Sequence, residues 1–179
     1  MSEAALSVRA LPADEALARC AALASVLIDC VEGGASVSFM APLARSTAEA
    51  FWRDVAEGVA AGRSILLVAE DPADGAIVGT VLVAFAQPEN QPHRADIAKM
   101  LVHRRARRRG AGAALMSAAE AAAREAGKTV LVLDTASPEA ERLYERAGWT
   151  RVGVVPDYAL MPDGQFCDTT FFYKRLDAG

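Results

Sequence analysis

Hydrophobic and polar positions change their spacing many times along the chain, and each change predicts a new element. Short apolar runs, either alternating or continuous, predict strands at 5–11, 64–71, 76–87, 93–103, 128–135, 149–155 and 166–176. Longer runs with apolar residues on one helical face predict helices at 13–31, 47–62, 112–127 and 139–147. Residues 35–45 have no clear period and contain Pro42, so we expect a loop there.

Turn and capping residues refine these boundaries. The turn at 72–75 and the MPDGQ segment at 161–165 each join two strands, so both pairs are expected to form antiparallel hairpins. Ser46 and Thr47 are candidate N-caps for the second helix, because their hydroxyls can accept from the free N–H groups of a first turn.

The middle of the chain predicts a different unit. Residues 128–135 (KTVLVLDT) are continuously apolar, which is typical of a strand buried on both faces. With the strand at 93–103 and the helix at 112–127 they predict a β-α-β unit with parallel strands and a right-handed crossover. The fold class is therefore α/β (α+β), with a mixed, mostly antiparallel sheet. No repeat or linker-like segment interrupts the pattern, so we expect one domain over 1–179.

Composition and charge exclude several classes of protein. The chain has 179 residues, of which 53% are hydrophobic, and its net charge of −4 disfavours a strongly basic nucleic-acid binder. Its three cysteines form no CxxC pair, and its two histidines lie ten residues apart, so neither a disulfide framework nor a metal site is expected. The charge-free apolar stretch at 76–87 is too short to span a bilayer. With no signal-peptide pattern at its start, we expect a cytoplasmic protein that needs neither membrane nor nucleic acid.

The segment at 100–115 (MLVHRRARRRGAGAAL) carries the clearest chemistry. Gly110 and Gly112 lie between a predicted strand and a helix, where glycine lets the backbone approach a ligand closely. The free N–H groups of a helix start favour an anion, typically phosphate. Three adjacent arginines, at 107–109, add positive charge. The segment lacks the Gly-Lys-Ser/Thr of a Walker A loop and is not GxGxxG, so it predicts another kind of phosphate cradle.

These residues resemble a known family. The run from Arg107 to Gly112 fits the R/Q-x-x-G-x-G/A acyl-CoA signature of GNAT-type N-acetyltransferases, and AERLYERAGWTRVG resembles that family's second conserved segment. The element order matches the GNAT fold, which implies helices on both faces of the sheet. HRADIAKMLV, LDTASPEAERLYERAGWTRVG and YALMPDGQFCDTTFFYKRL are most similar to the tabtoxin-resistance type of acetyltransferase.

The resemblance implies acetyl-CoA as co-substrate, no metal, and a set of donor-binding residues. The backbone of the strand would hold the pantetheine arm, and one of its N–H groups would polarise the thioester carbonyl. The helix start would hold the pyrophosphate, and Tyr144 would protonate the departing thiolate as a general acid. Ser137, which is also expected to cap its helix, stands where many members carry an asparagine. The implied donor-binding residues are Met100, Leu101, Val102, Arg107, Arg108, Arg109, Gly110, Ala111, Gly112, Ala113, Ser137 and Tyr144.

Two carboxylates in otherwise apolar strands are the candidates for acceptor binding. Asp96 and Asp134 are expected to hold a cationic amine and to help remove its proton, with Tyr144 completing the catalytic set. The alternative is a structural ion pair of Asp96 with Arg94 or with Lys99. Further residues could border the acceptor site: Ser38, Phe39 and Asp157. His103 is expected to point away from the acetyl group.

The predicted reaction is direct attack by a primary amine on acetyl-CoA in a ternary complex. The acceptor is expected to be a small cationic or amino-acid-like molecule, with antibiotics and toxins among the candidates. Two alternatives within reach of the resemblance are a peptide N-acetyltransferase and an acyl-CoA-binding sensor without turnover. A third is a nucleic-acid-binding module that uses the basic segment at 103–109, although the acidic net charge and the lack of interleaved aromatic residues weigh against it. The sequence leaves open both the identity of the amine and whether the chain is a monomer or a homodimer.

Overall fold

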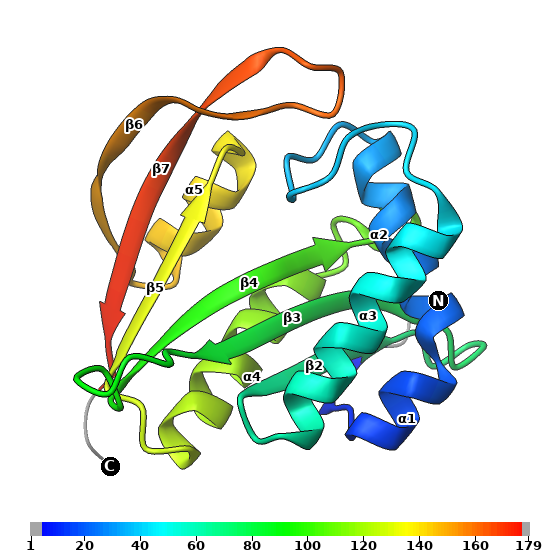
Figure 1. Cartoon of the computed structure of the whole chain (residues 1–179), viewed down its shortest axis with the longest axis horizontal. Helices are drawn as coiled ribbons and strands as arrows, with labels where there is room; N and C mark the ends of the chain where they lie inside the picture. Colours follow the sequence, from blue (N-terminus) through cyan, green and yellow to red (C-terminus); the bar gives the residue numbers. More distant parts are fainter. Residues whose placement is uncertain (1–4, 177–179) are drawn as a thin grey trace.

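The computed structural model describes residues 5–176, and in them seven strands form one mixed sheet in the order β1-β2-β3-β4-β5-β7-β6 (Figure 1). The strands are β1 (Ser7–Ala10), β2 (Ser64–Glu70), β3 (Ile77–Phe85), β4 (Arg94–Val102), β5 (Val130–Thr135), β6 (Thr150–Leu160) and β7 (Phe166–Arg175). Neighbouring strands are antiparallel except β4 and β5, which are parallel and joined through a helix. This confirms the predicted fold class and its β-α-β unit.

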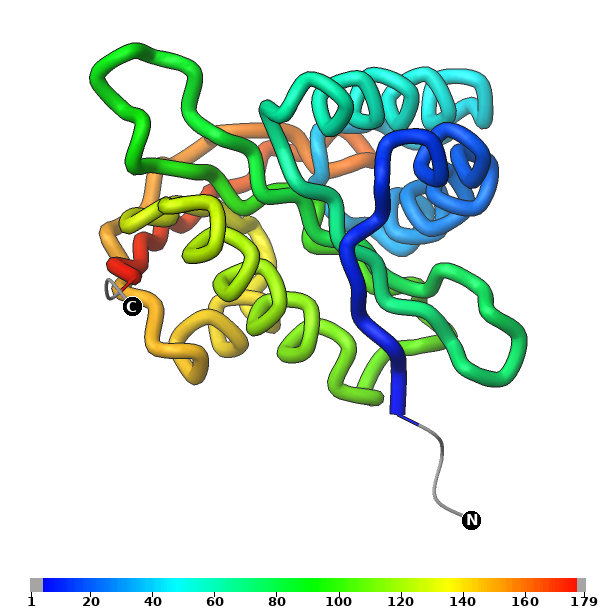
Figure 2. The backbone as a smooth tube through the Cα atoms, turned by 90° about the horizontal axis from the view of Figure 1, so that it is seen from below, coloured from blue at the N-terminus to red at the C-terminus, as the bar shows by residue number. Residues whose placement is uncertain are grey.

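Helices cover the two faces of the sheet, as predicted (Figure 2). On one face lie α1 (Ala13–Ala18), α2 (Cys20–Glu32) and α3 (Arg45–Ala60), and on the other lie α4 (Ala111–Glu125) and α5 (Pro138–Arg146). Successive strand residues point to opposite faces, so Leu66 and Val68 pack with the first group of helices, whereas Leu67 and Ala69 pack with the second. The sheet therefore has a hydrophobic core on each side.

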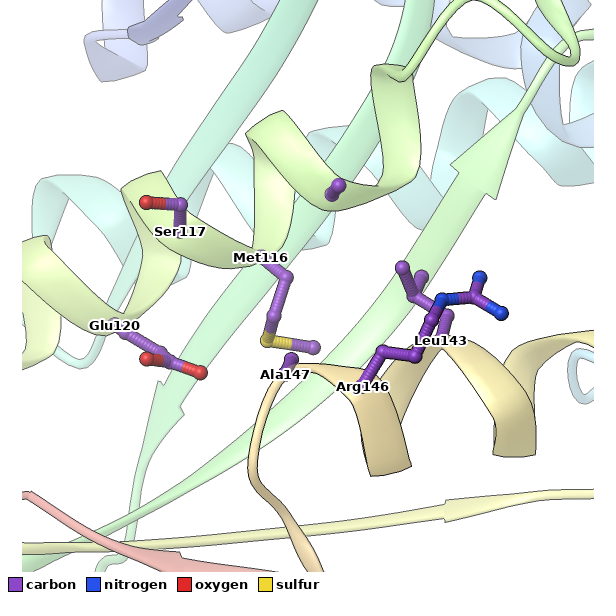
Figure 3. A pocket seen from close by; sticks show the side chains of 7 residues that line it. Met116, Ser117, Glu120, Leu143, Arg146 and Ala147 are labelled. Atoms are coloured by element: carbon purple, nitrogen blue, oxygen red, sulfur yellow. The ribbon is translucent and has the colours of Figure 1, made fainter.

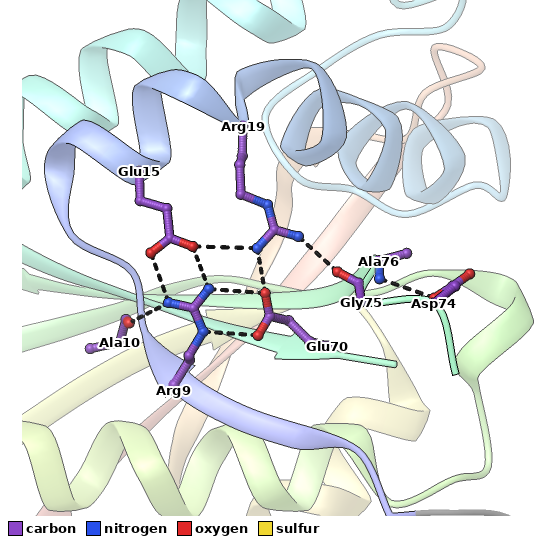
Figure 4. A network of polar contacts seen from close by, with 8 residues as sticks. All are labelled: Arg9, Ala10, Glu15, Arg19, Glu70, Asp74, Gly75 and Ala76. Atoms are coloured by element: carbon purple, nitrogen blue, oxygen red, sulfur yellow. Dashed lines mark hydrogen bonds and ion pairs between the residues drawn. The ribbon is translucent and has the colours of Figure 1, made fainter. Parts of the chain in front are cut away.

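An ion-pair network fixes the first strand and helix to the sheet (Figure 4). The guanidinium of Arg9 on β1 donates to Glu70 on β2, with Nε 2.8 Å from Oε2, and also to Glu15 on α1. Arg19 donates to Glu70 as well, and to the carbonyl of Gly75 2.9 Å away. Hydrogen bonds from Arg9 in particular lower the pKa of Glu70.

Arg19 also divides the helix that the pattern predicts as one element over 13–31. Its backbone leaves helical geometry at φ −106 and ψ 15, so α1 ends before it and α2 begins after it. The apolar period continues across the break and gives no sign of it. The contacts that hold Arg19 come from β2 and from the turn after it, which are remote in sequence.

Two further predictions were wrong. Ser46 and Thr47 do not cap the second helix, because α3 begins at Arg45 with Ala44 as its N-cap and no side-chain cap. β5 is not buried on both faces, because Val130 and Val132 are partly exposed and Asp134 is exposed. β5 lies beyond the core formed by α1–α3, so only its other face is covered.

Candidate active site

The sheet opens between β4 and β5. The two parallel strands pair only at Arg94↔Val130, Ala95↔Leu131 and Asp96↔Val132, and beyond these positions they diverge (Figure 1). β5 therefore supplies no ladder partner to the second half of β4, at 97–102. We call this opening the fork. It lies between the predicted acyl-binding strand and Asp134.

A β-bulge in β4 lies at the fork. Thr80 pairs with Leu101 and Leu82 pairs with Ala98, so two residues of β4 stand opposite Val81. One of them, Lys99, has a positive φ of 49°, and its carbonyl accepts from the Thr80 hydroxyl at 2.8 Å. A bulge re-aims the side chains of its strand.

The glycine segment after β4 forms an anion cradle at the start of α4. Gly110 is the N-cap, with a left-handed φ of 77° and no side-chain cap. In the part of the chain that the structure describes, no group accepts from the N–H groups of Ala111, Gly112 or Ala113. Gly112 lies so close to α5 that a Cβ there would be 3.1 Å from Cδ2 of Leu143. The free N–H groups and the helix dipole together favour a phosphate at this point.

The arginines around the cradle have different partners. Arg109 is mostly buried, and its guanidinium lies 2.6 Å from Oδ2 of Asp71, whose pKa this hydrogen bond lowers. Arg104 donates to Asp29 at 2.9 Å, and Arg105 to Asp74 at 3.2 Å. The side chains of Arg107 and Arg108 are exposed beside the helix start. The charge facing a cradle ligand therefore comes chiefly from these two.

Tyr144 lies in the core and near the fork at once. Ser137 caps α5 as predicted, accepting from the Ala140 N–H at 3.2 Å, with Pro138 at the first helical position. About two turns of helix then place the ring of Tyr144 between Phe172 and Trp149, with only 4% of the residue exposed. Burial, with a smaller contribution from Asp134, raises the pKa of Tyr144 to about 12. A phenol at that pKa stays protonated at neutral pH and can donate a proton.

The structure brings together the two predicted carboxylates. Asp96 pairs with Arg94, whose Nη1 lies 2.6 Å from Oδ1, so the structural ion pair considered for Asp96 exists. Burial raises the pKa of Asp134, Lys99 lowers it and Asp96 raises it again. Asp134 is thus within electrostatic reach of both neighbours and of Tyr144.

The loop at 35–44 and the β6–β7 hairpin meet above the fork. The Ser36 hydroxyl donates to the Leu160 carbonyl at 3.2 Å, and the Ala41 N–H donates to the Pro162 carbonyl at 3.0 Å. Ser38 in this loop accepts a hydrogen bond from Lys99 Nζ at 3.1 Å, so the loop contacts β4 at the fork.

The other predicted acceptor residues have different surroundings. Phe39 packs edge-on against Phe51 of α3, with ring centroids 5.4 Å apart. Asp157 is exposed on β6, and its N–H donates to Asp168 at 3.0 Å. His103 lies 3.6 Å from a carboxylate oxygen of Asp29 on α2.

A groove between α4 and α5 was not anticipated from the sequence (Figure 3). It has a volume of about 340 Å³ and starts at Ala113 in the cradle. Met116 and Leu143 form its apolar floor, and Arg146 lies at its side. At its far end Glu120 accepts from Lys174 at 2.8 Å and from the Trp149 indole at 3.0 Å. The apolar stripe of the helix at 112–127 was the only signal for it.

Lys99 is the functional candidate that sequence reasoning passed over. A lysine in an otherwise apolar strand was considered only as an ion-pair partner for Asp96. The bulge that turns it toward Ser38 and Asp134 depends on the register with β3, which the sequence does not display.

Two further observations concern the described part of the chain. Residues 5–176 hold no group of three or more histidine, cysteine, aspartate or glutamate side chains arranged to bind a metal ion. None of the helices in this range has the length and apolar character that crossing a membrane requires.

Comparisons with known proteins identify the family and similar folds. Residues 36–149 match the model of the acetyltransferase (GNAT) family. The fold is similar to that of yncA from Salmonella typhimurium, solved with its cofactor acetyl-CoA, at 21% identity and a TM-score of 0.79 over 97% of this chain and 95% of that one. It is also similar to a GNAT superfamily phosphinothricin acetyltransferase from Sinorhizobium meliloti in complex with AcCoA, at 18% identity and a TM-score of 0.80 over 98% and 91%.

A third similar structure is the ribosomal-protein-alanine N-acetyltransferase of Brucella melitensis, at 23% identity and a TM-score of 0.77 over 96% of this chain and 100% of that one. The family match spans well over half of the sequence, and the chain belongs to the GNAT acetyltransferase family. It is an acyl-CoA-dependent acetyltransferase.

Proposed function

We propose that this protein transfers an acetyl group from acetyl-CoA to the primary amine of a small cationic or amino-acid-like molecule. The observation that carries the proposal is the uncapped start of α4 at the end of the open β4 edge. A phosphate-binding helix start and an unpaired strand edge suit a ligand with a pyrophosphate and an extended, amide-containing arm. Two of the similar structures contain acetyl-CoA, which supports the same donor here.

The donor would lie along the fork. In this proposal the backbone of Met100, Leu101 and Val102 binds the pantetheine arm, and one of its N–H groups stabilises the oxyanion. The cradle at 107–113 binds the pyrophosphate, with Arg109 contributing mainly through its backbone because Asp71 engages its side chain. Ser137 uses its hydroxyl to cap α5, so its proposed part is to hold that helix beside the donor.

The chemical step needs one base and one acid. Asp134, with Asp96 nearby, would hold the acceptor ammonium and accept its proton, directly or through water. The free amine then attacks the thioester carbonyl carbon, a C–N bond forms, and the C–S bond breaks as the tetrahedral intermediate collapses. Tyr144 would give its proton to the departing thiolate, and the second proton lost by the attacking nitrogen would return to the Tyr144 oxygen, directly or through water, so that the products are the N-acetylated amine and CoA. Its raised pKa keeps that proton in place until the thiolate forms.

The acceptor side favours a small molecule over a peptide. The contacts of Ser36 with Leu160 and of Ala41 with Pro162 close the loop at 35–44 against the β6–β7 hairpin. A peptide needs an open groove there. The phosphinothricin acetyltransferase among the similar structures supports a small-molecule acceptor, and we assign the chain to the tabtoxin-resistance type of acetyltransferase. A protein acceptor is the second candidate, because the similar Brucella melitensis structure is a ribosomal-protein-alanine N-acetyltransferase.

We further propose that residues 1–179 form one catalytic domain that works in the cytoplasm. In the described structure Cys20, Cys30 and Cys167 are all free thiols, which fits a reducing compartment.

Initial rates of CoA release test this function. A panel of small amines and peptides is titrated against acetyl-CoA, with the folded protein confirmed by circular dichroism. Intersecting double-reciprocal lines with a small amine are the expected result, because both substrates must be bound together. Parallel lines would contradict direct attack, and turnover of peptides alone would favour the second candidate.

A further inference from the structure

Lys99 carries a half-buried positive charge that has no anionic partner within residues 5–176. Its Nζ donates to the Ser38 hydroxyl at 3.1 Å and lies 5.4 Å from the centroid of the Phe51 ring. Ion pairs join many other charged groups of residues 5–176, yet none of them includes Lys99. Burial lowers the pKa of this ammonium, which shows what its desolvation costs. A hydroxyl and an aromatic face compensate an ammonium that is partly removed from water less well than a carboxylate would.

Asp134, an exposed carboxylate at the end of β5, is an opposite charge that also lacks a partner among these residues. Within the described range it forms neither a hydrogen bond nor an ion pair, although burial raises its pKa. Lys99 lies on the half of β4 that β5 does not pair with, and Asp134 lies on β5 beyond the last paired position, so the two residues stand on the two sides of the fork. Each also acts on the pKa of the other. A structural salt bridge would have closed that gap, and here the two groups stay apart.

The structure explains what keeps them apart. The bulge fixes the backbone of Lys99 at φ 49°, and the buried Thr80 holds its carbonyl. Ser38 and Phe51 then hold the ammonium on the side of the loop at 35–44 and of α3, whereas Asp134 is on β5 across the fork. The acceptor would bind between these two residues, with the cationic Lys99 on one side and the anionic Asp134 on the other.

We infer that Lys99 binds an anionic group of the acceptor and selects aminocarboxylates as substrates. This inference rests on the proposed function. The acceptor ammonium would lie toward Asp134 and Asp96, and its carboxylate would lie toward Lys99. One zwitterion then pairs with both charges, and the two contacts together orient the amine toward the fork. A purely cationic amine would leave Lys99 without an anion and would be repelled by it.

Lys128 provides a matched control for a test. Its ammonium also bonds a neutral oxygen, the Pro92 carbonyl at 2.7 Å, and lies 4.3 Å from the centroid of the Phe85 ring. It precedes β5, at the paired end of β4 and β5 rather than at the fork. Lys99→Met and Lys128→Met therefore remove equivalent lysines, only one of which faces the acceptor space. Lys99→Arg keeps the charge.

The experiment measures kcat and KM with the standard L-amino acids, with the same compounds as carboxamides, and with alkyl diamines, all at saturating acetyl-CoA. The wild-type enzyme is expected to prefer at least one acid over its carboxamide by about tenfold or more in kcat/KM. At a pH above the range in which Asp134 titrates, Lys99→Met should raise KM for that acid and change little for the carboxamide. Lys99→Arg should retain part of the preference, and Lys128→Met should retain all of it. Ser38→Ala tests the alternative, in which Lys99 only stabilises the loop at 35–44 through its hydrogen bond to Ser38. In that case Ser38→Ala and Lys99→Met should each lose activity equally with the acid and with the carboxamide.

Three results would overturn the inference. They are equal use of acids and carboxamides by the wild-type enzyme, equal losses for both in Lys99→Met, and turnover of diamines but of no acid. Each of these is compatible with acetyl-CoA binding and leaves the proposed function standing. If the folded wild-type protein neither binds acetyl-CoA in a calorimeter nor releases CoA with any amine, the proposed function fails, and the inference fails with it.

Discussion

The ring of Tyr144 meets the ring of Phe172 nearly edge-on, with centroids 5.8 Å apart and an interplanar angle of 67°. This contact fixes a phenol between the hydrophobic core and the fork. The ring makes the packing contacts, whereas the hydroxyl carries the proposed acid role. A substitution that keeps the ring and removes the hydroxyl can therefore separate the structural role from the catalytic one.

Tyr144→Phe is expected to lower kcat by about a hundredfold or more, the usual scale for loss of a general acid. The KM for acetyl-CoA should change by no more than about twofold, because the ring that packs beside the fork remains. Steady-state kinetics check both values. Tyr173→Phe is the control, since that residue is 37% exposed on β7. An unchanged kcat in Tyr144→Phe would remove its role as the acid.

The same residue predicts a change in stability at alkaline pH. The folded pKa of Tyr144 is about 12, whereas an unfolded tyrosine titrates near 10. Below pH 10 Tyr144 is protonated in both the folded and the unfolded state, so its full contribution to the free energy of unfolding is present. As pH rises from 10 to 12 the unfolded state loses its proton first, which costs about 1.4 kcal/mol of stability per pH unit. Urea unfolding at several pH values should show this loss in the wild-type protein beyond that in Tyr144→Phe, and identical curves would contradict it.

Asp134 predicts how the rate depends on pH. If its carboxylate accepts the proton of the acceptor, kcat/KM should rise with pH as Asp134 ionises, at a pH above the range of an exposed aspartate, because burial raises its pKa. Asp96→Asn removes a neighbour that raises this pKa and should move the rise to lower pH. Lys99→Met removes a neighbour that lowers the pKa and should move the rise to higher pH. Shifts in the same direction would show that another group limits the rate.

Gly110 predicts a specific loss of donor binding. An alanine there meets nothing within 4 Å, so its only cost is the left-handed φ of 77°, about 1–2 kcal/mol. Gly62→Ala is a close control, with a φ of 67° and equally open space at the end of α3. Thermal melts should show similar destabilisation in both variants. Only Gly110→Ala should bind acetyl-CoA more weakly, and equal affinities would show that the cradle backbone does not contact the donor.

Much of the fold could be predicted because its signals are local. The alternating and continuous apolar runs gave the strands, and the Ser137-Pro138 pair gave the start of α5, since capping depends on neighbours in sequence. The cradle could be predicted for the same reason, because Gly110 lies between a strand and a helix in the sequence as well as in space.

The features that sequence reasoning missed depend on contacts between distant residues. The break at Arg19 follows its contacts with Glu70 and Gly75, and the positive φ of Lys99 depends on the register with β3. The open face of β5 was missed because a continuous apolar run looks the same whether one face or both are covered. For the same reason the facing charges of Lys99 and Asp134, which lie 35 positions apart in the sequence, could be found only in the structure.

Binding of acetyl-CoA tests the central claim most directly. Acetyl-CoA is titrated into the folded wild-type protein in a calorimeter at physiological salt, with Gly110→Ala and Gly62→Ala alongside. The account predicts saturable binding at one site per chain, which is weakened in Gly110→Ala and retained in Gly62→Ala. No binding by the folded wild-type protein would contradict it and would leave the arginine-glycine segment as an exposed basic turn.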